Sequence, residues 1–269
     1  MNMVERASKA VNAGRAADRQ AAGEGFLRSF SRGLAVISTL GKLRGRRTIS
    51  SVAEATGLPR AVVRRILSTL CELQYAHTDG REYQLTPKVL TLGLSYLASL
   101  PYLAYAQQAL SELSAEIGES CAMAVMDGNE AVFILRIPSR KVLSPNLVVG
   151  SRLPAYATSP GRMLLSQLDE AALERYLEAT TLKPYTERTP TSPGQLREAL
   201  ARVREKGYAW VDRELDPAVA GLSVPLRDRQ RQVVAALSVS VIAEGWTEER
   251  AVEAYLTPMR RAAECIRME

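Results

Sequence analysis

The sequence predicts an α+β protein with a helical front part and a rear part built on an antiparallel sheet with flanking helices. Three observations lead to this expectation. Helical periodicities meet at a tight turn near Gly57, and the hairpin pair Asp79-Gly80 follows them. A second hairpin pair, Asp127-Gly128, separates two apolar runs in the rear part. Hairpins flanked by helices favour this class over a doubly wound nucleotide fold.

The chain divides into four predicted parts. Residues 1–25 are rich in Ala, Gly and Arg and have little to bury, so a disordered arm is expected. Residues 26–87 hold the helices and the first hairpin, and residues 88–100 form an apolar linker helix that Pro101 ends. Residues 101–269 form the α+β domain.

The front part begins with a helix over residues 31–43, where Leu34, Ile37 and Leu40 recur at helical spacing. A short second helix follows a basic turn. The run Ser51-Val-Ala-Glu54 fits a capping box for it, and Thr48 is an alternative cap.

The third helix, over residues 59–73, follows a sharp turn. Gly57 suits the left-handed conformation that ends one helix, and Pro59 suits the first turn of the next. Helices joined this closely must cross, and with the hairpin over residues 75–86 they form a winged helix-turn-helix.

The two faces of the third helix differ in chemistry. We expect its core side to carry Val62, Ile66, Leu70 and Leu73. Arginine can grip guanine O6 and N7 or a phosphate, so the other face indicates contact with duplex DNA; solvated surface charge is the alternative for any single arginine. The candidate DNA-binding residues, with those of the basic turn and the hairpin, are Arg46, Arg47, Arg60, Ala61, Arg64, Arg65, Ser68 and Arg81.

The net positive charge is confined to the front part. Up to Pro87 there are 14 Lys and Arg against 7 Asp and Glu, whereas the remainder has 21 against 22. A basic part joined to a nearly neutral one indicates a domain that binds a polyanion, followed by a domain with a different role.

The rear part alternates helices and strands. A helix over residues 102–117 ends at Gly118. Strands are expected over residues 120–126, 131–137, 208–215, 222–227 and 233–242, and helices over residues 160–168, 170–179, 193–206 and 247–267.

Catalytic and metal-binding chemistry is sparse. The single histidine, His77, lies in the hairpin and has no triad partners. The three cysteines are far apart and are expected to be small buried thiols, and no cofactor is expected. Asp212 and Glu214 lie two apart on a predicted strand, where they are either solvated or able to do acid–base work.

No apolar run reaches membrane-spanning length and no signal peptide is recognisable, so a cytoplasmic protein without a membrane partner is expected.

A ligand site in the rear part has several candidate residues. A helix starting near Ser159 directs N–H groups and a positive dipole end at what precedes it, which suits a carboxylate, although a capped helix without ligand is equally consistent. Ser238 and Ser240 share a strand face and either admit close packing or leave room for a polar ligand. Arg136 pairs with an acid or is an ordinary surface arginine.

Several motifs, in order, resemble the IclR family of bacterial transcription regulators. They are Arg28-Ser-Phe-Ser-Arg32, Thr56-Gly-Leu-Pro59, Tyr83-Gln-Leu-Thr-Pro87, Leu153-Pro-Ala-Tyr-Ala157, Val224-Pro-Leu-Arg-Asp228 and Ala236-Leu-Ser-Val-Ser240. The resemblance runs from about Arg28 to the C-terminus. Within the family, the sequence is most similar to the branch that regulates protocatechuate and p-hydroxybenzoate catabolism.

This resemblance implies a GAF-like C-terminal effector domain, a linker helix that pairs chains, and a homodimer or homotetramer. It also implies a small organic, in particular aromatic, acid as effector. The effector contacts it implies are Ser159, Gly161, Arg162, Asp212, Gly221, Ser223, Ser238 and Ser240. The loop at residues 220–225 departs from the family pattern because it lacks an arginine, and it also lacks the cysteine of the small-acid branch.

The leading hypothesis is therefore an effector-responsive transcription factor, not an enzyme, that binds a pseudo-palindromic double-stranded DNA operator. Two alternatives stay open from the sequence. One is a DNA-tethered enzyme that uses Asp212 and Glu214 on a small acid. The other is a constitutive DNA-binding dimer with an inert C-terminal domain.

Overall fold

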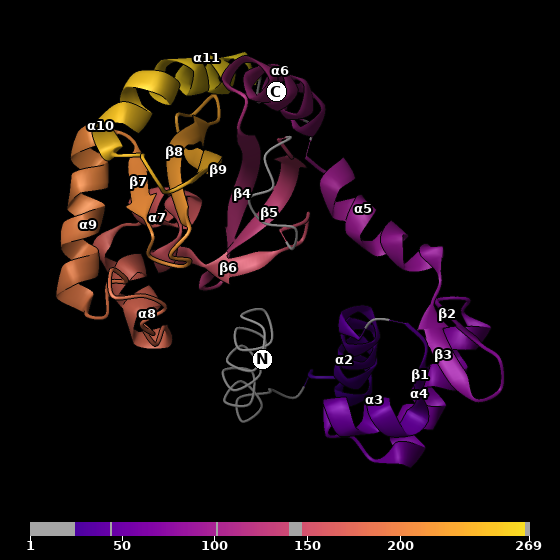
Figure 1. Ribbon diagram of the computed structural model, residues 1–269. Helices are drawn as coiled ribbons and strands as arrows, with labels where there is room; N and C mark the ends of the chain where they lie inside the picture. Colours follow the sequence, from indigo (N-terminus) through magenta and orange to yellow (C-terminus); the bar gives the residue numbers. More distant parts are fainter. Residues whose placement is uncertain (1–24, 44, 101, 140–146, 267–269) are drawn as a thin grey trace. The chain divides into compact units, whose positions relative to one another are not determined.

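The computed structural model describes residues 25–43, 45–100, 102–139 and 147–266 (Figure 1). The predicted disordered arm, except Gly25, lies outside these residues. The chain separates into two compact units, Met1–Ser95 and Tyr96–Glu269. Each unit has its own hydrophobic core, so each is described by itself.

The first unit is a three-helix bundle with a small sheet. Its elements are α2 (Arg28–Lys42), β1 (Arg47–Thr48), α3 (Ile49–Thr56), α4 (Arg60–Glu72), β2 (Ala76–Thr78) and β3 (Glu82–Leu85). The sheet has the order β1-β3-β2, with antiparallel pairs throughout. The hairpin of β2 and β3 is the predicted wing, and β1, which was not predicted, adds a third strand to it.

Local signals place these helices. Thr48 is the N-cap of α3, its side chain accepting from the Ser51 N–H, so the alternative cap is correct and the box at Ser51 is wrong. Gly57 ends α3 with φ of 68°, a left-handed conformation that costs glycine little. Pro59 precedes α4 directly, and only three residues separate α4 from the end of α3.

The core of the first unit corrects two expected faces. Val63 and Leu67 are fully buried in α4, whereas Leu73 is 52% exposed, so the core stripe lies one residue later than Val62 and Ile66. In α2 the buried residues are Val36 and Leu40, and Leu34 is exposed. A broad apolar face fits two neighbouring phases of the helical period, and tertiary packing selects one of them.

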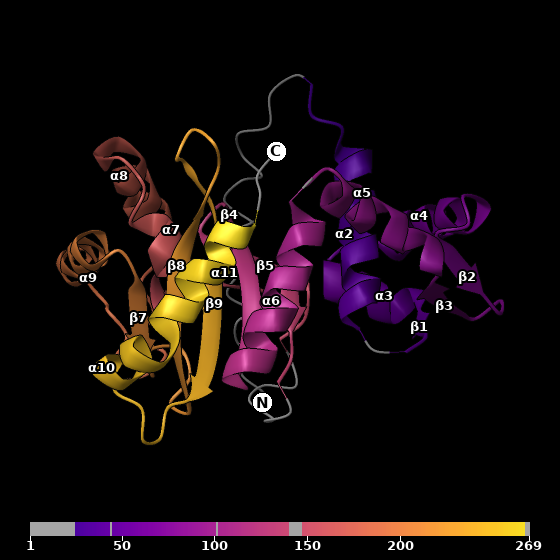
Figure 2. The same ribbon diagram turned by 90° about the horizontal axis from the view of Figure 1, so that it is seen from above.

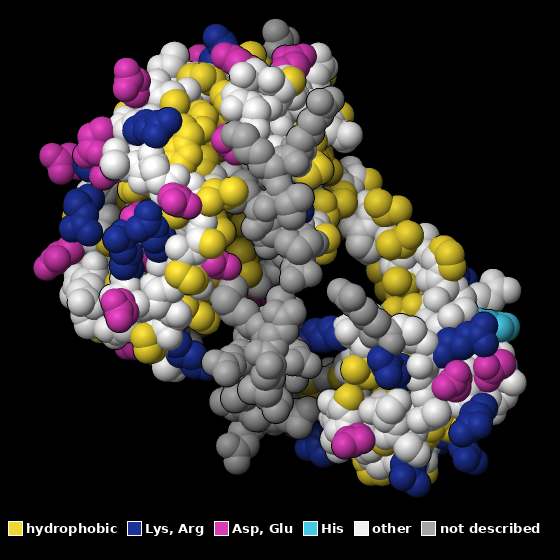
Figure 3. Space-filling view, viewed as in Figure 1, with side chains coloured by type: hydrophobic (Ala, Val, Ile, Leu, Met, Phe, Trp, Pro, Cys, Tyr) yellow, Lys and Arg dark blue, Asp and Glu magenta, His cyan; other side chains and the backbone are white. Residues whose placement is uncertain are grey.

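Between the units, η1 (Pro87–Val89) leads into α5 (Leu90–Ala98). No residue of α5 is buried within the described chain. Its exposed large side chains are Leu90, Leu92, Leu94 and Tyr96, whose spacing of two residues spreads them over more than one side of the helix, as the sequence predicted. Figure 3 shows hydrophobic side chains at the surface along this helix.

The second unit is a six-stranded antiparallel sheet with helices on both faces. Its strands are β4 (Ser120–Asp127), β5 (Glu130–Ile137), β6 (Arg152–Pro154), β7 (Ala209–Asp212), β8 (Val219–Arg227) and β9 (Val233–Ile242), in the spatial order β6-β5-β4-β9-β8-β7. Its helices are α6 (Leu103–Ile117), η2 (Ala155–Ala157), α7 (Ser159–Leu165), α8 (Glu170–Ala179), α9 (Pro193–Lys206), α10 (Glu248–Ala251), η3 (Val252–Leu256) and α11 (Thr257–Cys265).

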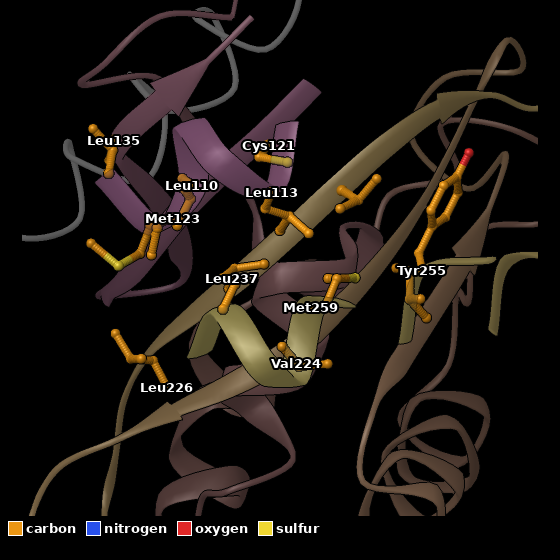
Figure 4. Packing of buried hydrophobic residues seen from close by; sticks show 14 of the residues in the cluster. Leu110, Leu113, Cys121, Met123, Leu135, Val224, Leu226, Leu237, Tyr255 and Met259 are labelled. Atoms are coloured by element: carbon orange, nitrogen blue, oxygen red, sulfur yellow. The ribbon is translucent and has the colours of Figure 1, made fainter. Parts of the chain in front are cut away.

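One face of this sheet holds the main core. Helices α6 and α11 lie side by side over it (Figure 2). Figure 4 shows Leu110 and Leu113 of α6 and Met259 of α11 packed against Met123 and Leu237 of the central strands. Alternate residues of β4, β8 and β9 supply this layer because side chains alternate across a strand.

The other face carries small residues and is covered by α7, whose residues are all buried. Its strand positions include Ala122, Ala124, Gly221, Ser223, Ala236 and Ser238. Small side chains allow α7 to approach the strands closely, and a Cβ on Gly221 would meet the Ser159 side chain.

Several predicted bounds need correction. The predicted strand over residues 208–215 ends at Asp212, because Arg213 has a positive φ of 59°. The closing helix is interrupted by the π-helical turn η3, and β6 was not predicted. Cys121 is buried as expected, whereas Cys71 is half-buried and Cys265 is exposed.

Among the described residues, no single helix is long and apolar enough to cross a membrane, and one bent pair, residues 87–98 with 103–117, reaches that length and composition only jointly.

Candidate nucleic-acid interface and candidate effector site

The outer face of α4 is open and basic. Its exposed residues include every position predicted for contact with DNA on this helix, namely Arg60, Ala61, Arg64, Arg65 and Ser68. The buried Val63 and Leu67 fix the opposite face in the core, so the arginines are directed outward. Figure 3 shows Lys and Arg side chains distributed over the outside of this unit. A helix of this kind can enter a major groove with its arginines at base edges or phosphates.

Two further predicted residues, one on the wing and one in the basic turn beside it, have different surroundings. Arg81 is exposed at the turn. Arg46 forms an ion pair with Asp79, with 3.0 Å between Nη1 and Oδ2. The Asp79 carboxylate also accepts from the Glu82 N–H at 2.8 Å and the Arg81 N–H at 3.0 Å. These backbone bonds, and then Arg46, lower the pKa of Asp79 to about 2.

Arg47 lies on β1, where it is half-buried and in register with Tyr83 of the wing. Thus β1 fastens the basic turn to the wing, and the structure brings Arg46, Arg47 and Arg81 to one small sheet.

In the second unit, the predicted effector residues separate into two groups. The first group joins α7 to β8 and β9. Ser223 donates to Ser159 across 2.9 Å between their Oγ atoms, and both side chains are buried. Ser238 is in register with Ser223, and Ser240 with Gly221. A Cβ on Gly221 would lie 2.6 Å from the Ser159 Oγ.

The start of α7 is closely packed. A Cβ on Gly161 would lie 2.3 Å from the Cα of Ala155, so η2 lies directly against this turn. The Gly161 N–H donates to the capping Thr158 hydroxyl, and the Arg162 N–H to the Thr158 carbonyl. Two of the N–H groups at the helix start that the sequence offered to a carboxylate, those of Gly161 and Arg162, therefore have partners within the chain.

The second group is a set of ion pairs. Arg162, only 5% exposed, forms two bonds to the Glu214 carboxylate, at 2.9 and 2.5 Å, and a third to the Tyr156 carbonyl at 2.5 Å. Burial raises the pKa of Glu214, and the nearby Arg162 opposes that shift. Asp212 pairs separately with Arg188 and Arg213.

These pairs contradict an acid–base role for Asp212 and Glu214. Only Asp212 is on the strand, and the left-handed Arg213 separates the two residues. Each carboxylate is engaged by a different arginine, so they do not form one reacting pair. Among the described residues, no group of three His, Cys, Asp or Glu side chains is placed to hold a metal ion.

The structure also brings together residues that the sequence did not group. Arg136 is in register with Ala122, which is in register with Ser238. In the neighbouring row Ser120 is in register with Ser240. In the sequence, these residues were marked only by the alternation of small residues within each separate strand. The order of the strands in the sheet was needed to show that they are neighbours.

A pocket of about 430 Å³ lies elsewhere in the unit, at the C-terminal end of α7. Met163, Val203 and Arg204 are among its lining residues, and none of the predicted effector contacts is.

Comparison with known proteins identifies both units. Residues 29–80 match the model of the IclR helix-turn-helix domain, and residues 94–268 match the model described as bacterial transcriptional regulator IclR C-terminal.

Curated relatives extend the match. The Pca regulon regulatory protein of Pseudomonas putida is 43% identical over 216 residues, covering 80% of this chain and 74% of its own. The p-hydroxybenzoate hydroxylase transcriptional activator of Acinetobacter baylyi is 34% identical over 220 residues, covering 80% and 81%.

Solved structures agree with the fold. A transcriptional regulator from Rhodococcus sp. RHA1 is 38% identical with a TM-score of 0.79, covering 90% of this chain and 97% of its own. The inducer-binding domain of a PobR double mutant from Acinetobacter, in complex with 3-hydroxybenzoic acid, is 30% identical with a TM-score of 0.56, covering 59% and 93%. The predicted family and fold class are confirmed, and the relatives are regulators, not enzymes. The chain belongs to the IclR family of bacterial transcriptional regulators.

Proposed function

We propose that this regulator controls genes of aromatic-acid catabolism by binding a pseudo-palindromic operator as a dimer or tetramer, and that a small aromatic acid bound in the second unit alters this binding. The observation that carries the DNA-binding part is the exposed basic face of α4, held outward by the buried Val63 and Leu67. Arg60, Arg64 and Arg65 are its principal donors to DNA.

The acid effector rests on the relatives. One is named for p-hydroxybenzoate hydroxylase and another is bound to 3-hydroxybenzoic acid. The sheet face under α7 carries the hydroxyl groups of Ser223, Ser238 and Ser240, which are groups of the kind that such a ligand needs. The exposed apolar α5 supports assembly, because its exposed Leu90, Leu92 and Leu94 can be buried against a second copy.

The DNA-binding proposal is tested with a promoter fragment taken from beside the gene that encodes this protein. Arg64→Ala should weaken binding of this fragment by about 1–3 kcal/mol in fluorescence anisotropy. Arg175→Ala removes the same charge from an exposed position of α8 in the second unit and serves as the control. Unchanged affinity in the separate alanine variants of Arg60, Arg64 and Arg65 would contradict this docking.

The effector proposal is tested by ligand-dependent stability. An acid present at 100 times its dissociation constant should stabilise the folded protein by about 2.7 kcal/mol, which a thermal-shift panel of hydroxybenzoates detects. A flat panel combined with specific promoter binding would instead identify a constitutive DNA-binding dimer.

A further inference from the structure

A partly desolvated arginine lies on the same sheet face as the buried serines. The register β5-β4-β9-β8 aligns Arg136, Ala122, Ser238 and Ser223, and side chains of register-paired residues point to the same face. This is the face opposite the main core. Arg136 is half-buried and donates through Nη1 to the Leu147 carbonyl. Burial lowers the pKa of its guanidinium, as expected for a cation partly withdrawn from water.

Hydroxyl groups lie on the same face beside this arginine. Ser238 is 2% exposed and donates to the Ala122 carbonyl across 3.4 Å, at the long limit for such a bond. Ser120 and Ser240 form the next row, with Ser240 half-buried. Arg136 and these serines define the polar corner of the face.

The other side of Arg136 is apolar. A bulge between Met123 and Ala124 places Phe133, in register with Ala124, on the same face as Arg136. Ala122, Ala124, Ala131 and Phe133 form a buried cluster, and Leu147 packs against it. A cation with hydroxyls on one side and an aromatic and aliphatic surface on the other matches an aromatic carboxylate, which has one charged end and a flat apolar ring.

We infer that Arg136 binds the carboxylate of the effector, with Ser238 as a second donor and with the ring lying on the cluster that contains Phe133. This inference rests on the proposed effector function. It names the residue that makes the site specific for an acid. Of the two interpretations that the sequence left open for Arg136, it selects the pairing with an acid, and it leaves Arg162, which the resemblance listed as an effector contact, in its ion pair with Glu214.

The test uses the full chain and three probes, 3-hydroxybenzoate, 4-hydroxybenzoate and 3,4-dihydroxybenzoate, each paired with its neutral amide. Isothermal titration gives the ratio of acid to amide affinity. The wild-type chain should prefer at least one acid. Arg136→Met should lower the affinity for that acid at least about tenfold. The affinity for the neutral amide should change little when the positive charge of Arg136 is removed, so the ratio of acid to amide affinity should fall close to one. Arg136→Lys, which keeps the charge but not the two-pronged geometry, should be intermediate.

Two further variants make the outcome decisive. Arg229→Met, at an exposed position near the β8–β9 turn, removes the same charge and should leave the ratio unchanged. Ser238→Ala should weaken acid binding about fivefold, and it tests the corner independently if Arg136→Met proves unfolded in thermal melts. A wild-type acid-to-amide ratio in Arg136→Met or, if that variant is unfolded, a wild-type acid affinity in Ser238→Ala overturns the inference while leaving the effector proposal intact. If the wild-type chain binds none of the acids, the effector proposal itself fails, and the inference fails with it.

Discussion

Gly161 shows how one residue fixes the position of α7. Any larger side chain meets the backbone of Ala155, which cannot move aside as a flexible side chain can. Gly161→Ala should therefore lower the free energy of unfolding by about 3 kcal/mol or more in urea titrations. Gly194→Ala, at an early position of α9 with open space around it, is the matched control and should change stability by less than about 1 kcal/mol. Equal effects in the two variants would contradict this packing.

Asp79 gives a residue-scale prediction about pH. Its folded pKa of about 2 lies below the ordinary aspartate value, so the charged carboxylate stabilises the wing above about pH 4, and this contribution is lost as pH falls toward 2. The backbone N–H groups of Arg81 and Glu82 are the main cause and Arg46 the lesser one. Carboxyl NMR titration of Arg46→Met should thus still give a depressed pKa for Asp79. A return to the ordinary value would assign the shift to the ion pair.

At the scale of elements, two properties of α4 have different origins. Local sequence decides where the helix begins, and packing decides which of its faces is buried. Gly57 and Pro59 fix where the helix begins, because they act through their own backbone angles. The rotation of the helix was predicted one residue off, because Val62, Val63, Ile66 and Leu67 are all apolar and only contacts with α2 and α3 select Val63 and Leu67. The predicted exposure of the arginine face is nevertheless confirmed, since that face is wide enough to tolerate the error.

The linker helix α5 supports a prediction about assembly. Leu94 is 56% exposed on a helix without buried residues. Leu94→Glu should lower the molar mass measured by light scattering in solution, because a carboxylate opposes burial of this face against a second copy. Ser95→Glu adds the same charge at the next, polar position and should leave the assembly unchanged. A wild-type mass for Leu94→Glu would exclude this face as the pairing surface.

For the whole molecule, the proposed coupling between acid and DNA has a thermodynamic requirement. If an acid changes operator affinity by some factor, the operator must change acid affinity by the same factor, since both report one coupling free energy. Acid titrations with and without saturating operator, beside operator titrations with and without saturating acid, should therefore give equal factors. A typical coupling is 1–3 kcal/mol, about 5- to 150-fold. Unequal factors would show that a further state or stoichiometry is involved.

Charge is a second property of the whole molecule that the sequence predicts well. The excess of Lys and Arg before Pro87 coincides with the unit that presents the basic α4. Net charge needs no contacts to be counted. Individual ion pairs do need them, and the pairing of Arg162 with Glu214, 52 residues apart, had no sequence signal.

The sequence by itself determined the helix-turn-helix, the two hairpins and the family, because each depends on residues close together in the chain or on motifs in a fixed order. Only the tertiary structure decided which arginines are engaged internally and which small residues share one face. The shared face of small residues arises from the strand order β5-β4-β9-β8, which joins residues more than a hundred positions apart, and the ion pairs arise from contacts between loops and helices distant in the chain. Local periodicity says which face of a strand is polar but not which strand becomes its neighbour.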